Sequence, residues 1–149
     1  MKTMKRYLLI FALLLGAVCS YAQNTTTDFV VLDQSAPNLS QLQTQFAGQP
    51  NVFLNDNNKP APYIIAAVLE GKQVVDLHLY AATQPGVINF GSTVITPVTA
   101  GNYSEYFIKW KNNVNGKVVV HSTSVFTTAQ GAELKALLIQ LTGLDFITP

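Results

Sequence analysis

Two histidines and a short run of hydroxyl side chains are the groups in this chain that could carry acid–base or nucleophilic chemistry. His121 is followed by Ser122, Thr123 and Ser124, and His78 lies within an apolar run. A histidine can activate a hydroxyl only when it lies within hydrogen-bond reach of it. Because neighbouring side chains of a strand point to opposite faces, His121 and Ser122 are not expected to meet. The pattern is therefore more typical of a strand-end histidine than of a catalytic pair.

The sequence offers little support for a metal site, a pair of catalytic acids or a cysteine nucleophile. His78 and His121 could bind a metal ion only if their strands are neighbours, and no third ligand stands at a spacing characteristic of zinc sites. The acids are scattered, without a pair suited to glycoside hydrolysis. The single cysteine, Cys19, lies within the first 22 residues, which leaves the rest of the chain without a thiol. The sequence predicts no catalytic residue, no metal and no cofactor.

Asp33 and a set of aromatic residues each allow two interpretations. Asp33 ends the first apolar run, at the sheet edge where Tyr80 and Ser122 are also expected. Its carboxylate could line a cleft, although an acid followed by Ser35 more often caps a turn. The aromatic residues of segment 103–110 could form a binding face, but their helical spacing favours packing in the core.

The first 22 residues have the pattern of a secretory signal peptide. Three basic residues precede the apolar segment 7–18, which is too short to span a bilayer, and residues 20–22 form a small-x-small cleavage site. The alternatives are an uncleaved anchor and acylation at Cys19. Cleavage would leave six lysines against eight acids, a net charge of −2. We expect export to the periplasm, cell surface or medium without a membrane span, and no nucleic-acid partner, because no basic patch is present.

Hydrophobic periodicity predicts one α/β domain over residues 29–149, after a flexible leader at 23–28. Strand patterns occupy residues 29–32, 51–54, 74–80, 117–121 and 144–147. Helical patterns occupy residues 39–47, 60–69, 103–110 and 132–141, with Asn38 as the first N-cap and Gly143 as the last C-cap. This alternation predicts a three-layer sandwich with a mostly parallel sheet flanked by helices, and a small β-hairpin inserted at 87–95.

Three segments, 29–38, 77–91 and 131–145, resemble a bacterial family in their order and spacing. The family is the domain of unknown function numbered 4347, often found near the start of very large secreted, repeat-rich surface proteins. It is similar in fold to the caspase-like cysteine peptidases. The resemblance covers nearly all of the predicted domain and implies a caspase-like arrangement of sheet and helices.

This chain departs from the family at the positions that the resemblance marks as catalytic. The family has Ser-His-Gly after the third strand, whereas residues 81–83 here are Ala-Ala-Thr. It has Tyr-Gly-Cys at the end of the fourth strand, whereas residues 121–123 are His-Ser-Thr. Ala82 cannot accept a proton, and the hydroxyl of Thr123 is a poor nucleophile without activation. The resemblance therefore implies a pseudoenzyme.

The sequence thus favours an exported, catalytically inactive caspase-like module that binds a protein, peptide or glycan of unknown identity. Its vestigial cleft is expected at Asp33, Tyr80, Ala82, Thr83, His121, Ser122 and Thr123. One alternative is a hydrolase with a non-standard site near His121. Another is a structural subunit that self-associates through an apolar edge strand such as 144–147.

Overall fold

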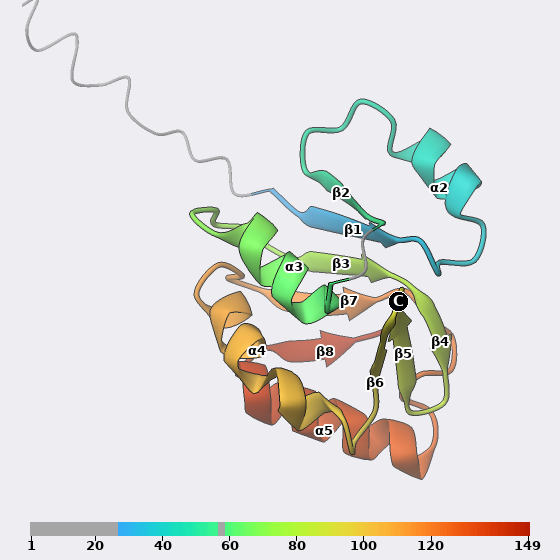
Figure 1. Ribbon diagram of the computed structural model, residues 1–149, viewed down its shortest axis with the longest axis vertical. Helices are drawn as coiled ribbons and strands as arrows, with labels where there is room; N and C mark the ends of the chain where they lie inside the picture. The colour runs from blue at the N-terminus through green and yellow to red at the C-terminus, as the bar shows by residue number, and fades with distance from the viewer. Residues whose placement is uncertain (1–26, 57–58) are drawn as a thin grey trace, which may run out of the picture.

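Figure 1 shows the computed structural model of the chain, in which residues 27–56 and 59–149 are described. Five parallel strands form the main sheet, in the order β2-β1-β3-β7-β8. They are β1 (Phe29–Asp33), β2 (Val52–Asn55), β3 (Leu77–Tyr80), β7 (Lys117–Val120) and β8 (Asp145–Ile147). A second, antiparallel sheet contains β4 (Ala82–Gln84), β5 (Val87–Phe90) and β6 (Thr93–Ile95).

Helices flank the main sheet on both faces. They are α2 (Leu39–Gln45), α3 (Ala61–Leu69), the 3₁₀ helix η1 (Ala100–Tyr103), α4 (Ser104–Lys111) and α5 (Ala129–Thr142). Side chains of α3, α4 and α5 share one buried cluster with the strands, so these helices cover one face (Figure 1). The opposite face carries Tyr80, whose ring contacts Phe46 at the end of α2. The predicted α/β fold with helices around a mostly parallel sheet is confirmed.

Side-chain alternation along β3 explains how the sheet is oriented. Leu77 and Leu79 are 0% and 1% exposed and pack against the helices α3, α4 and α5. His78 and Tyr80 point to the other face and are half-buried. Full burial of a leucine side chain contributes about 1.5–3 kcal/mol relative to exposure, so the leucines fix the face that receives the helices.

The two predicted cap residues, Asn38 and Gly143, both lie at helix ends. Thr128 caps α5 by accepting a hydrogen bond from the backbone of Gly131, and Gly143 ends α5 in the predicted left-handed conformation, with φ 69°. Asn38 precedes α2, but its side chain makes no cap hydrogen bond and its φ is 60°. Asn38 therefore occupies the predicted N-cap position, but it takes a left-handed backbone, which asparagine tolerates, and does not cap α2 through its side chain.

The start of β3 and the extent of the hairpin sheet differ from the sequence prediction. β3 begins only at Leu77, because the preceding Val74 forms an isolated bridge with Val114 rather than continuing the ladder. Residues 82–84, which carried no strand pattern, form β4 and extend the predicted hairpin into three strands. Pairing with the apolar strand β5 overrides the weak local preference of this segment.

The N-terminal predictions fall mainly outside the described part of the chain. The predicted signal peptide 1–22 and residues 23–26 of the predicted leader lie outside the described residues. The last two leader residues are described, and both contact the segment before β3: the Thr27 carbonyl accepts from the backbone of Val75, and the Asp28 carboxylate accepts from that of Asp76. Within residues 27–56 and 59–149, none of the helices has the length and apolar character needed to cross a membrane.

Candidate functional site

A pocket of ≈ 590 Å³ lies at the carboxyl ends of β3 and β7. Five of the predicted cleft residues line it, namely Ala82, Thr83, His121, Ser122 and Thr123. In open α/β sheets, ligands bind outside the carboxyl ends of the strands. The fold therefore brings these five residues together at the edge where a ligand is expected.

Asp33 lies close by but is fully buried, at 0% exposure. Its Oδ1 accepts hydrogen bonds from the backbone N–H groups of Ser35 and Gly91, both at 2.8 Å. Its Oδ2 accepts from the side-chain amide of Asn55 at 2.5 Å. The structure therefore confirms the turn-capping interpretation of Asp33 and places its carboxylate beneath the surface, where it joins β1 and β2 to the hairpin.

Ser35 extends this connection, which the sequence did not reveal. Its hydroxyl donates to the carbonyl of Asn89 at 2.7 Å and accepts from the backbone N–H of Ala82 at 3.1 Å. The turn after β1 is thereby attached to both β4 and β5. These bonds hold one wall of the pocket in place.

The hydroxyl of Ser122 holds the opposite wall. It accepts from Thr83 Oγ1 at 2.7 Å and from the backbone N–H groups of Ser124 and Val125 at 3.2 and 3.1 Å. These partners order the turn after β7. The ring of His121, in contrast, points toward β3, so the expected separation of His121 from Ser122 is found.

His121 stands where three hollows of the surface meet. Besides the pocket of ≈ 590 Å³, it lines one of ≈ 670 Å³ beside α2 and one of ≈ 470 Å³ that also contains Asp28 and His78. Tyr80 lines the second and third of these. Its ring stacks on that of His121, with centroids 3.8 Å apart and an interplanar angle of 9°.

A row of polar side chains continues from His121 across the face of the sheet opposite to α3, α4 and α5. His121 Nε2 lies 3.0 Å from His78 Nδ1 because β3 and β7 are adjacent. His78 Nε2 in turn lies 3.5 Å from Asp28 Oδ2. The two histidines are therefore satisfied residues of the sheet face, as expected for His78, and they contact each other rather than a hydroxyl.

Burial and, secondarily, the positive charge that His78 can carry lower the pKa of His121 to about 4. Burial also raises the pKa of Tyr80 above its ordinary value of 10.0. His121 is consequently neutral near pH 7. A base with so low a pKa removes protons poorly at that pH, which disfavours His121 as the activator of a nucleophile.

The remaining sequence candidates have structural roles. Phe107 and Trp110 are buried in the core, and the Trp110 indole donates to the Pro62 carbonyl at 3.1 Å. The aromatic set is therefore part of the core, as expected. Gly86 and Gly91 have φ values of 73° and 54° and form the turns on either side of β5.

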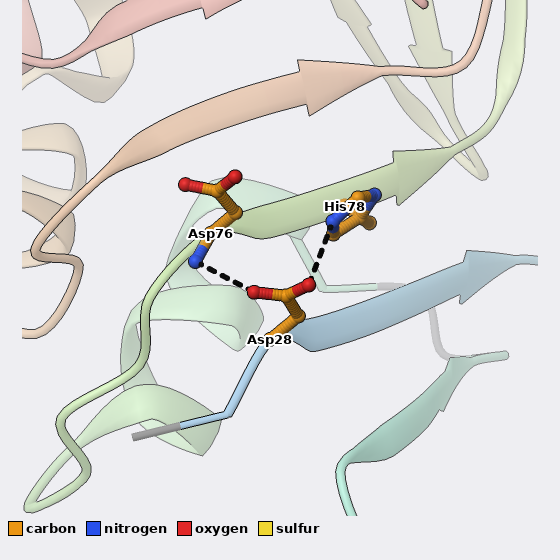
Figure 2. A group of neighbouring side chains, drawn as sticks. All are labelled: Asp28, Asp76 and His78. Carbon is orange, nitrogen blue, oxygen red and sulfur yellow. Dashed lines mark hydrogen bonds and ion pairs between the residues drawn. The ribbon is translucent and has the colours of Figure 1, made fainter.

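A cluster with metal-ligating side chains lies at the opposite edge of the sheet (Figure 2). Asp28, Asp76 and His78 each offer one ligand atom, and these atoms lie within 4.8 Å of one another. This cluster was not predicted from the sequence. The sequence does contain a signal for it, because Asp28 directly precedes β1 and Asp76 directly precedes β3. The pairing of Phe29 with Leu77 places these two aspartates side by side.

Comparison with family models identifies the domain. The model for "Domain of unknown function (DUF4347)" matches residues 29–148. The chain belongs to the DUF4347 family. Its DUF4347 region begins with β1 and ends just after β8, so it includes both sheets. No curated protein and no solved structure matches the chain.

Proposed function

We propose that this DUF4347 domain acts after export as a ligand-binding module on a caspase-like scaffold that lacks a working peptidase dyad. The observation that carries the proposal is the pocket of ≈ 590 Å³ that Ala82 and Thr123 line together. These are the positions where the family resemblance places a histidine and a cysteine. A pocket that keeps its place in the fold but not its reactive groups is suited to binding.

The chemistry around Thr123 supports a role without catalysis. Thr123 is exposed, and the hydroxyl beside it, that of Ser122, is occupied by backbone N–H groups of its own turn. The nearest histidine, His121, contacts His78 and Tyr80 instead. A nucleophile needs a base within reach, and His121 is directed to partners other than Thr123.

The proposed location is the periplasm or the cell surface. The basic, apolar and small-residue pattern of residues 1–22 supports it. The ligand class follows from the pocket lining, which consists of hydroxyl, methyl and proline side chains together with the neutral His121. Such a surface suits an uncharged polar ligand, either an extended peptide or a glycan.

Binding can be tested by recording amide NMR spectra of the full chain with panels of neutral peptides and oligosaccharides. We expect one class of ligand to shift the amides of residues 81–83 and 121–124. Thr123→Trp should weaken that binding at least ~10-fold by filling the pocket. Val98→Trp places the same ring at an 89% exposed site outside the pocket lining and should bind normally. If the ligand shifts the same amides with the same affinity in Thr123→Trp as in the wild type, the proposal is contradicted.

A hydrolase near His121 is the competing function, and activity assays separate the two. We expect no turnover of fluorogenic peptides, esters or glycosides by the wild type, and the same result from Thr123→Ala. Turnover that His121→Ala abolishes would contradict the proposal and establish the hydrolase.

Self-association remains a second candidate because β8 is an edge strand of the main sheet. Within β8, Phe146 is unsuitable as a test position, because its side chain is 1% exposed and belongs to the core. Ile147, which is half-buried on the other face, is a better choice. If β8 pairs between copies, sedimentation should show a concentration-dependent oligomer that Ile147→Lys disrupts.

A further inference from the structure

We propose that Asp28, Asp76 and His78 form a binding site for a divalent transition-metal ion, with Zn²⁺ as the preferred occupant. The site lies at the amino-terminal edge of β1 and β3, away from the pocket at the carboxyl edge (Figure 2). This proposal does not rest on the proposed ligand-binding role.

The separation of Asp28 and His78 fits a shared metal better than a direct hydrogen bond. Asp28 Oδ2 and His78 Nε2 are 3.5 Å apart, longer than the ~2.7–3.2 Å of ordinary hydrogen bonds. Two ligands of a tetrahedral zinc ion, each bound at about 2.0–2.2 Å, lie roughly 3.3–3.6 Å apart. An ion between these two atoms would therefore require little movement of either side chain.

His78 is oriented in the way that metal-binding histidines usually are. Its Nδ1 lies 3.0 Å from His121 Nε2, and the His121 ring is itself stacked on Tyr80. Ligating histidines typically use the second ring nitrogen in such a contact, which fixes the ring and its tautomer. With an ion on Nε2, the proton of His78 resides on Nδ1 and is donated to His121 Nε2.

The third ligand, Asp76, lies near the other two, but its carboxylate contacts Lys117. Its Oδ1 accepts from the backbone N–H of Lys117 at 3.0 Å, and its Oδ2 lies 3.5 Å from Lys117 Nζ. Gly116 makes room for this carboxylate, since a Cβ there would lie 2.2 Å from Asp76 Oδ1. A rotation of the Asp76 side chain would bring an oxygen onto the ion, in competition with the Lys117 ammonium.

The ligand chemistry selects the class of ion. One imidazole and two carboxylates form a mixed nitrogen and oxygen set, which suits zinc and its neighbours better than the all-oxygen preference of Ca²⁺ or Mg²⁺. Three protein ligands would leave one position of a tetrahedral ion for water.

Isothermal titration of the full chain with ZnCl₂ tests the site, using untagged protein stripped with EDTA. A Cys19→Ser background removes the single thiol as a competing ligand. We expect one ion per chain and a rise in melting temperature on zinc addition. Asp28→Asn and His78→Gln should each weaken zinc binding at least ~10-fold. His121→Phe removes the partner of His78 Nδ1 and should weaken zinc binding about 10-fold.

Controls distinguish this site from general attraction of cations. Asp56→Asn removes an exposed carboxylate at the opposite end of the sheet and should leave the affinity unchanged. Lys117→Gln should strengthen binding, because it removes the ammonium that competes for Asp76. Melting curves without metal confirm that each variant folds. Absence of stoichiometric binding, or equal affinity in folded Asp28→Asn and His78→Gln variants, would overturn the proposal.

Discussion

The two faces of strand β3 have opposite characters. On one face, Leu77 and Leu79 are sealed beneath the helices α3, α4 and α5. On the other, His78 and Tyr80 remain half-buried beside His121, which lines three surface pockets. One four-residue strand thus contributes to the core with every second side chain and to the candidate sites with the rest. Stability and binding should therefore be separable by mutation within a single strand.

The largest expected effect is on the leucine face. Leu79→Ala should lower the free energy of unfolding by about 2–5 kcal/mol, because it leaves a cavity in a packed core. Tyr80→Ala, one residue further along, should cost less because Tyr80 is half-buried. Urea denaturation of both variants measures the difference. Equal losses would remove the contrast between the two faces.

A second effect concerns the carboxyl edge of the sheet. Asp33→Ala should destabilise the fold by about 1–3 kcal/mol or more, because it leaves the backbone N–H groups of Ser35 and Gly91 without their acceptor. Asp33→Asn keeps one acceptor oxygen and should cost less. If the two variants unfold at the same urea concentration, the hydrogen bonds of Asp33 do not support this edge.

The histidine face should respond to pH, whereas the leucine face should not. The unfolded chain protonates His121 near its ordinary pKa of 6.5, and the folded chain only near 4. The unfolded state therefore binds more protons between these values, and stability falls as the pH drops from about 6.5 to 4. In His121→Phe, which retains a ring against Tyr80, this part of the loss should disappear. Urea denaturation at pH 7, 5.5 and 4.5 tests it, and a pH dependence identical to that of the wild type would contradict it.

The smallest expected effect is at the pocket itself. Thr123 is exposed and outside the hydrogen bonds that hold the turn, so Thr123→Ala should change stability by less than about 0.5 kcal/mol. Its zinc affinity should equal that of the wild type, since the proposed metal site lies at the other edge. A measurable change in zinc affinity would indicate that the two edges are coupled.

Much of the fold could be predicted because its signals are local. The run at 29–32 and the leucines of α5 follow strand and helix periods, and Gly143 ends α5 where a glycine was expected. β4 could not be predicted, because its pairing with β5 rather than its own residues makes it a strand. The left-handed backbone of Asn38 was likewise set by the turn that surrounds it.

The sequence by itself determined the fold class, the family, and which side chains of β3 share a face, since alternation along a strand is a property of neighbouring residues. Only the tertiary structure decided which strands are adjacent. The order β1-β3-β7 sets Asp28 beside His78 and His78 beside His121, although the two histidines are 43 positions apart in the chain. The order of the strands depends on how all the apolar surfaces of the chain are buried together. It therefore cannot be predicted from a local sequence pattern.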